Sequence, residues 1–308
     1  MKKVVELIIS IICFTAILFS GPIKPIPNEV KVDKKKVQLG KKLFFDPILS
    51  RDGTISCATC HDLQNGGDDG LKFSFGIGGK EGNINSPTVY NAVFNFRQFW
   101  DGRAKNLKEQ VIGPIENPVE MGHSMEGAVE TLKQSKIYSS DFINVYSDGI
   151  TQENIADAIA EFEKTLITPD SPFDRYLKGD EEAISQKAKE GYRLFESKGC
   201  VLCHHGVNIG GNFYNKFGIY EDVNSSNLGR YNITKREEDK YVFKVPSLRN
   251  IALTSPYMHD GRINTLKSAV EFMTRHQLGR HMEEGETDAI VEFLKSLTGE
   301  IPVIVRLK

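Results

Sequence analysis

The pentads Cys57-Ala-Thr-Cys60-His61 and Cys200-Val-Leu-Cys203-His204 are the stretches of this 308-residue sequence that decide its fold. Each has the Cys-x-x-Cys-His spacing of haem c attachment: two thiols one helical turn apart reach the two vinyl groups, and the adjacent histidine supplies an axial nitrogen to iron. The sequence therefore predicts two covalently bound haem c groups, with His61 and His204 as iron ligands.

Three other uses of these four cysteines are weaker interpretations. A zinc site of four thiolates would require the two pairs to converge and would leave both histidines unexplained. A disulfide across two residues is strained, and a thioredoxin-like dithiol needs a βαβ context that this sequence lacks. Haem attachment accounts for the cysteines and the histidines together.

The pentads sit inside a longer internal repeat, which marks two similar halves. A Leu-Phe segment precedes each pentad, a Pro-x-x-x-Asn segment and an Asp-Gly-Arg segment follow it, and the spacing from Pro to Asp is 14 residues in both halves. Each half ends with a similar helical stretch. The matched segments are 40–44 with 191–195, Pro87–Asn91 with Pro246–Asn250, Asp101–Arg103 with Asp260–Arg262, and 157–166 with 288–297.

The repeat predicts an all-α fold with two cytochrome c-like haem domains in tandem. Apolar residues recur at i, i+3 and i+7 in both closing stretches, which is the pattern of an amphipathic helix. We place the first domain at residues 33–167 and the second, with a C-terminal tail, at 168–308; the turn-rich segment 168–172 is the hinge. The only alternating pattern, 241–245, predicts a short hairpin.

The N-terminus carries an export signal. Lys2 and Lys3 precede an apolar run from Leu7 to Phe19, so residues 1–21 are predicted to be a signal peptide, with an uncleaved anchor as the alternative. Residues 22–32 fit an extended linker, because this segment contains three prolines, Pro22, Pro25 and Pro27. A net charge of -2 argues against a nucleic-acid partner.

The two halves differ at the positions that decide iron chemistry. In the second half Met273 follows Asp260–Arg262 on a predicted helix, 265–275, where a thioether would complete His/Met ligation and favour electron transfer. In the first half the corresponding region instead offers Gln110 and Glu120. A carboxylate on the open side of a haem can move the proton that peroxide cleavage requires. Core packing of Met273 and a solvated surface position for Glu120 are the structural alternatives.

With these residues in view, the chain resembles the bacterial di-haem cytochrome c peroxidase family. The matching stretches span nearly the whole chain after the signal; they are 39–47, 56–61, 85–88, 98–103, Glu120-Met121, 248–250 and 256–261. The resemblance implies that His61 is the proximal ligand of a peroxidatic haem with Gln110 and Glu120 on its distal side. His204 and Met273 would ligate an electron-transfer haem.

The resemblance implies further roles at the domain interface. Trp100 would lie between the haems and help electrons cross, and His259 would lie near the haem propionates rather than on iron. A calcium ion would be held by Asn85 and by the backbone carbonyls of Thr254 and Pro256. The implied activity is reduction of hydrogen peroxide in the periplasm by a homodimer that takes electrons from a small redox protein, such as a monohaem cytochrome c or a cupredoxin.

One departure from the family concerns the loop after the first pentad. There the family usually carries a histidine that occupies the sixth site of the peroxidatic iron in the oxidised state, whereas this chain has Ile77. Isoleucine cannot bind iron, so we predict a first haem that needs no reductive activation. If a sixth ligand is nevertheless present, Met121, His123 and Lys80 are the residues to test.

Two other functions remain open at this stage. One is a protein-modifying di-haem oxygenase of the kind that matures methylamine dehydrogenase, in which a tyrosine replaces the methionine ligand; Met273 favours the peroxidase. The other is a di-haem electron shuttle without peroxide chemistry. The sequence does not identify the electron donor.

Overall fold

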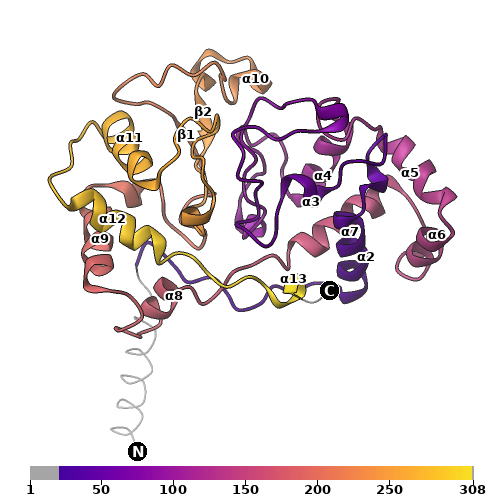
Figure 1. Cartoon of the computed structure of the whole chain (residues 1–308), viewed down its shortest axis with the longest axis horizontal. Helices are drawn as coiled ribbons and strands as arrows, with labels where there is room; N and C mark the ends of the chain where they lie inside the picture. The colour runs from indigo at the N-terminus through magenta and orange to yellow at the C-terminus, as the bar shows by residue number, and fades with distance from the viewer. Residues whose placement is uncertain (1–20, 307–308) are drawn as a thin grey trace, which may run out of the picture.

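The computed structural model describes residues 21–306, and in this range the chain is predominantly helical, as predicted (Figure 1). Of the predicted signal peptide, 1–21, residues 1–20 lie outside the described residues. Within the described range, no helix combines the length and the apolar character needed to cross a membrane. The helices are α2 (Lys34–Phe45), α3 (Cys57–Cys60), α4 (Leu107–Glu116), α5 (Met125–Gln134), α6 (Lys136–Ile143), α7 (Gln152–Glu163), α8 (Pro172–Leu177), α9 (Gln186–Ser197), α10 (Tyr231–Thr234), α11 (Leu266–Leu278), α12 (Glu286–Lys295) and α13 (Val303–Arg306).

Each half is built on one close helix pair, α2 with α7 and α9 with α12. The repeated glycine before each pentad explains the close approach. A Cβ on Gly40 would lie 1.8 Å from the carbonyl oxygen of Ala158, and one on Gly191 would lie 1.9 Å from that of Ala289. Because no side chain fits there, both positions require glycine. The predicted opening and closing helices are therefore confirmed, and the same packing device is used twice.

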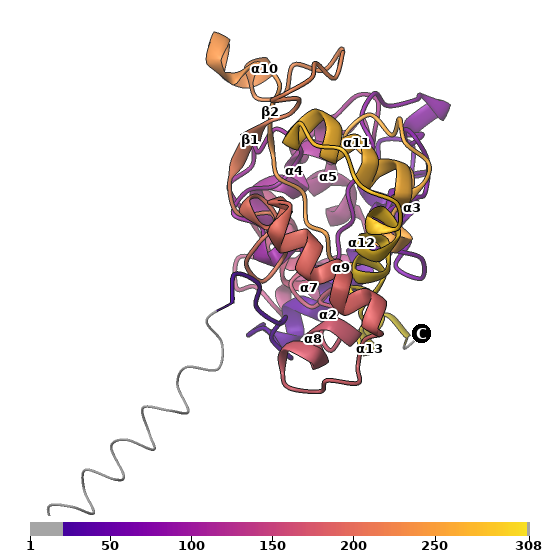
Figure 2. The ribbon, with the colours of Figure 1, turned by 90° about the vertical axis from the view of Figure 1, so that its left-hand side faces the viewer.

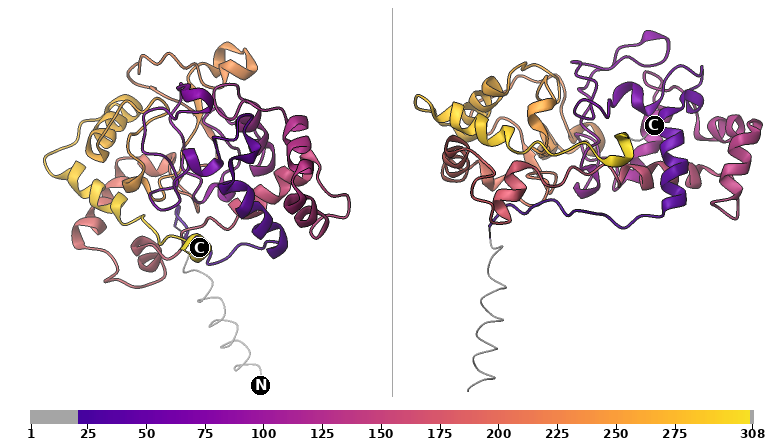
Figure 3. Two further views of the ribbon diagram at one scale, coloured as in Figure 1. Left: turned by 45° about the vertical axis from the view of Figure 1, so that its right-hand side comes forward. Right: turned by 60° about the horizontal axis from the view of Figure 1, so that its bottom comes forward.

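The two helix pairs lie at the centres of two separate hydrophobic clusters. The first cluster contains Leu43, Phe44, Ile159 and Phe162 from α2 and α7, and the second contains their counterparts from α9 and α12. The chain ends cross over: Ile23 packs in the second cluster, and Val305 of α13 packs in the first. Figure 3 shows the N-terminal segment running along one edge of the molecule to reach α2.

Thr168 joins the two halves in the predicted hinge. Its Oγ1 atom accepts hydrogen bonds from the side-chain amides of Asn91, at 2.8 Å, and Asn250, at 3.0 Å. These two asparagines occupy matched positions of the repeat, both have φ of 60°, and all three residues are buried. Asparagine tolerates this left-handed conformation better than most residues because its side chain can hydrogen-bond locally.

The strand prediction at 241–245 was correct, but the predicted hairpin was wrong. Strand β2 (Val242–Lys244) pairs antiparallel with β1 (Tyr214–Lys216), a segment distant in sequence. The loop between them carries α10, which projects from the body of the molecule (Figure 2). Long-range pairing of this kind leaves no turn signal in the sequence, so periodicity alone could not find the partner.

The predicted linker is extended, but it is fastened to the second half. The backbone of Lys24 donates to the carbonyl of Gly206, and the Gly206 amide donates to that of Pro22. Arg249, only 1% exposed, donates to the carbonyl of Lys24 and forms a buried ion pair of 2.8 Å with Asp174. The backbone amide of Ile26 also donates to Asp174, so this pair holds the segment to α8.

We expect Arg249→Met to destabilise the folded protein by about 3–5 kcal/mol, because it leaves the Asp174 carboxylate buried without its partner. Denaturant unfolding of the holoprotein measures this. The control is Arg236→Met, which removes an exposed ion pair with Glu238 and should leave the unfolding midpoint unchanged. Equal midpoints for the two variants would contradict the structural role of the buried pair.

Candidate haem sites

The first pentad is carried by α3, a single helical turn that puts Cys57 and Cys60 on one side. Ser56 and Thr59 form a capping box at its start. His61 ends the turn, and its Nδ1 atom lies 3.1 Å from the carbonyl oxygen of Gly67. A hydrogen bond from Nδ1 fixes the ring and leaves Nε2 for a metal, as is usual for ligating histidines. Burial lowers the pKa of His61, which favours the neutral imidazole.

The second pentad repeats this arrangement on a 3₁₀ turn, Cys200–Leu202. The Nδ1 atom of His204 lies 3.2 Å from the carbonyl oxygen of Ile209. Burial lowers the pKa of His204 to about 4, so its imidazole is neutral at pH 7. None of the four cysteines in the described range forms a disulfide. Both pentads thus present two free thiols and one oriented imidazole.

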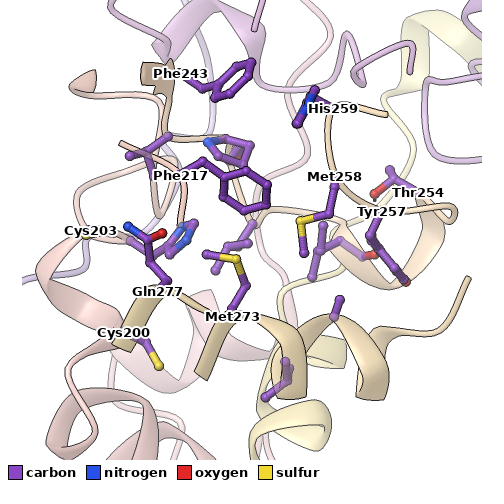
Figure 4. A pocket seen from close by; sticks show the side chains of 18 of the residues that line it. Cys200, Cys203, Phe217, Phe243, Thr254, Tyr257, Met258, His259, Met273 and Gln277 are labelled. Atoms are coloured by element: carbon purple, nitrogen blue, oxygen red, sulfur yellow. Dashed lines mark hydrogen bonds between the residues drawn. The ribbon is translucent and has the colours of Figure 1, made fainter. Parts of the chain in front are cut away.

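A cavity with mostly apolar walls lies beside the second pentad (Figure 4). His204 and both thiols line it, together with Leu266 and Leu294 from α11 and α12. Met273, from the helix predicted to carry it, points into the same cavity. A thioether, an imidazole and two thiols around an apolar cavity are what a His/Met-ligated haem c requires. The second site therefore fits the predicted cofactor.

Met258 also points into this cavity, although the sequence pattern did not single it out. It lies in a loop with φ of 73°, directly before His259, and places a second thioether beside Phe217. No periodic pattern marks such a position. The only available signal was that a methionine stands inside 256–261, one of the stretches that resemble the family.

Lys244 is a second residue that the sequence analysis missed. Its side chain is 7% exposed, lines the cavity, and is not among the ion pairs of the described residues. Burial lowers the pKa of Lys244 to about 8. A buried ammonium group requires an anion, and the two carboxylates of a haem would meet that need. The signal in the sequence was a lysine within the otherwise apolar segment 242–245, which indicates a buried ammonium group.

Trp100 and His259 meet at the rim of the cavity that faces the first half. The indole Nε1 atom donates to the carbonyl of Asn85 at 2.9 Å, and the indole ring lies edge-on to the His259 ring, with centroids 6.2 Å apart. His259 stacks on Phe243 and its Nε2 atom lies 2.7 Å from the Ser225 hydroxyl. Burial lowers the pKa of His259. The arrangement holds both rings rigidly beside the cavity.

Glu120 lies close enough to the first pentad for its charge to act on Cys60. Its carboxylate is half-buried, and burial raises its pKa, opposed by a 2.6 Å hydrogen bond from the Asn117 amide to Oε1 and by the charge of Arg103. Gln110 is half-buried on α4, whose N-cap is Asn106. The structure thus brings Glu120 to the first pentad.

Ile77 lies against the same segment. Its backbone amide donates to the Glu120 carbonyl at 2.7 Å, and its side chain is 4% exposed. Gly76 allows this approach, since a Cβ there would lie 2.1 Å from the Val119 carbonyl oxygen. The loop after the first pentad therefore lies against the backbone of Glu120, with the Ile77 side chain buried.

The three residues predicted to hold calcium line the cavity from both halves. The side-chain nitrogen of Asn85 donates to the Leu71 carbonyl at 2.9 Å, which turns that amide so that its oxygen is left to accept. Thr254 and Pro256, whose backbone carbonyls are the other predicted ligands, line the cavity from the second half. This amide-and-carbonyl site stays a prediction.

Comparison with known proteins gives one consistent family. The family model described as di-haem cytochrome c peroxidase matches residues 34–182. The chain is 49% identical over 284 residues to cytochrome c peroxidase Ccp of Escherichia coli (strain K12), covering 90% of this chain and 61% of that protein. The chain thus spans less than two thirds of this relative's length.

Two further matches extend over nearly complete proteins. Cytochrome c551 peroxidase of Nitrosomonas europaea is 48% identical over 284 residues, covering 91% of this chain and 85% of that protein. The crystal structure of a MauG-like protein associated with microbial copper homeostasis is 27% identical, with a TM-score of 0.80 and coverage of 92% of this chain and 96% of that chain. The chain belongs to the di-haem cytochrome c peroxidase family and is an enzyme of that family.

Proposed function

We propose that the protein reduces hydrogen peroxide to water, at the first haem site, with electrons that a small redox protein delivers to the second. The observation that carries this proposal is the inequality of the two sites: a half-buried carboxylate, Glu120, stands near the first pentad, whereas the thioether of Met273 points into the cavity of the second. Haem c bound at the two sites would supply iron that exchanges electrons with the donor and with peroxide.

Glu120 performs the proton transfer. Its Oε1 atom is held by the Asn117 amide, which leaves Oε2 to take a proton from the nearer peroxide oxygen and to return it to the departing oxygen as water. The Gln110 amide orients the peroxide by hydrogen bonding. The backbone amide of the buried Ile77 donates to the Glu120 carbonyl, which helps to hold this carboxylate in position.

The second half stores and passes electrons. His204 and Met273 are the proposed iron ligands, and Lys244 and His259 bind the haem carboxylates. Trp100, between Asn85 and His259, lies on the path between the two halves. We assign the tandem cytochrome c-like domains to 33–167 and 168–308. A methionine in the position where the protein-modifying oxygenases carry tyrosine favours the peroxidase.

Three further properties belong to this proposal. Export to the periplasm follows from the signal at 1–21 and fits covalent haem attachment. Calcium, bound by Asn85 and the carbonyls of Thr254 and Pro256, would bridge segments of the two halves. The active form would be a homodimer, and the donor a monohaem cytochrome c or a cupredoxin.

Turnover of hydrogen peroxide with a reduced cytochrome c tests the central claim. We expect Glu120→Gln to lower kcat by about 10²–10⁴-fold, because the glutamine cannot shuttle the proton. The matched control is Glu130→Gln, an exposed residue paired with Lys133, which should keep the parent rate. Absence of turnover in the parent protein would leave only the electron shuttle.

The pH profile tests the role of Asn117. The carboxylate form of Glu120 is the base, and burial raises its pKa, so activity should be lost on the acid side at a pH above the ordinary range of glutamate. Asn117→Asp removes the amide donor and adds a negative charge; both raise the Glu120 pKa further. We expect the acid limb of kcat/KM to move to higher pH, and an unmoved limb would contradict the assignment.

The resting state of the first haem tests the role of Ile77. We expect the fully oxidised protein to show a five-coordinate or water-bound first haem by EPR and Raman spectroscopy, and Ile77→His to convert it to a six-coordinate low-spin form. The rival ligands have other contacts: Lys80 donates to the Pro118 carbonyl, His123 accepts from the Ser124 amide and lies 3.3 Å from the Thr131 hydroxyl, and Met121 packs in the first hydrophobic cluster. A purely low-spin parent spectrum would contradict the prediction.

A further inference from the structure

Glu163, at the end of α7, is a buried carboxyl group that the proposed mechanism does not use. Its side chain is 5% exposed, and its Oε2 atom has no hydrogen-bond partner. Burying a polar atom without a partner is unfavourable, and considerably more so when the group is charged. Such a residue calls for a physical explanation.

Its position places it at the first haem site. The charge of Glu163 acts on Cys57 and raises the pKa of that thiol, so the two side chains are near neighbours. The internal repeat pairs Glu163 of α7 with Leu294 of α12. Leu294 lines the cavity beside the second pentad, together with Ile290. Glu163 therefore stands where the other half places a leucine against its cofactor.

We infer that Glu163 couples proton uptake to electron entry at the first haem site. At alkaline pH, where Glu163 is a carboxylate, the arrival of one electron from the donor is accompanied by uptake of one proton from solvent at Oε2, so that the charge of the buried site is unchanged. When that electron leaves for peroxide, the same O–H bond breaks and the proton returns to solvent. This inference rests on the haem assignment of the proposed function, but not on peroxide turnover.

Electrostatics supports the coupling. Burial alone raises the pKa of Glu163 to about 8, so the group titrates in an accessible range of pH. In a medium of low dielectric constant, an added negative charge nearby raises that pKa further, and ionised Glu163 conversely disfavours the added electron. Leu294 cannot titrate, so the second site lacks a carboxyl group at this position.

Most charged groups of α2, α4, α5 and α7, the helices that pack together around Glu163, are engaged elsewhere. Burial is the sole cause of its pKa shift, so none of them acts on it appreciably. Cys57 ceases to titrate once it forms a thioether. The engaged groups are Lys36 and Lys108 with Asp157, Lys42 with Asp141, Lys105 with Glu109, Lys133 with Glu130, and Glu161 with Lys164.

Redox titration of the holoprotein tests the inference. The midpoint potential of the first haem is measured by spectroelectrochemistry from about pH 6 to about pH 10, and the second haem is followed separately. If one proton accompanies each electron, the equilibrium constant for reduction changes tenfold per pH unit. The parent midpoint potential should therefore fall by up to about 59 mV per pH unit. Glu163→Leu and Glu163→Gln should remove this slope, and the alkaline potential of both should exceed that of the parent.

Two controls separate the alternatives. Glu161→Gln, at a neighbouring carboxylate bonded to Lys164 and to the Asp33 amide, should keep the parent slope. Redox-difference infrared spectra of the parent should show the carbonyl stretch of a carboxylic acid forming on reduction, absent in the nearly isosteric Glu163→Gln.

A parent potential independent of pH, or an unchanged slope in Glu163→Gln, would overturn the inference. These readouts need no peroxide. Failure of the parent to turn over peroxide would overturn the proposed function and leave the Glu163 measurement intact.

Discussion

The shared hydrogen bonds of Thr168 fix the relation between the two halves, and both haem sites depend on it. Its hydroxyl oxygen accepts from Asn91 and Asn250, and its backbone amide donates to the Asn91 side chain at 2.9 Å. All three residues are 2% exposed or less, so an unmade bond would leave a buried polar atom unpaired. Asn91 and Asn250 occupy matched positions of the internal repeat, so the two halves meet through equivalent loops. Each of these loops leads to the Asp-Gly-Arg segment of its own half.

This near-symmetry makes the differences between the halves informative. The same helix pair, the same glycine contact and the same histidine-to-carbonyl hydrogen bond occur on both sides. Where the second half places Met273 and Leu294 around its cavity, the first half offers Glu120 and Glu163. Two carboxyl groups with pKa values raised by burial thus stand near the first pentad. This difference is the basis for proposing proton chemistry at the first site and electron storage at the second.

The boundary between the halves is built from rigid, mostly uncharged groups. Trp100, His259 and Phe243 are held by ring contacts and by hydrogen bonds to Asn85 and Ser225. Lys244 is the exception, a buried ammonium that lines the adjoining cavity. A charge desolvated in this way is tolerated where an anionic group binds, so the cofactor itself would complete the interface.

The sequence by itself determined the cysteine pairs, their histidines, the repeat register and the amphipathic helices, because each depends on spacing within a few turns of chain. It also located Met273 and Glu120, since comparison of matched positions needs no coordinates. Only the tertiary structure decided that β2 pairs with β1, that the chain ends cross between the two cores, and that Met258 and Lys244 line the cavity. The burial of Glu163 was likewise decided only by the tertiary structure. Burial and long-range pairing depend on which distant segments pack together, and a residue's own neighbours in sequence carry no record of that choice.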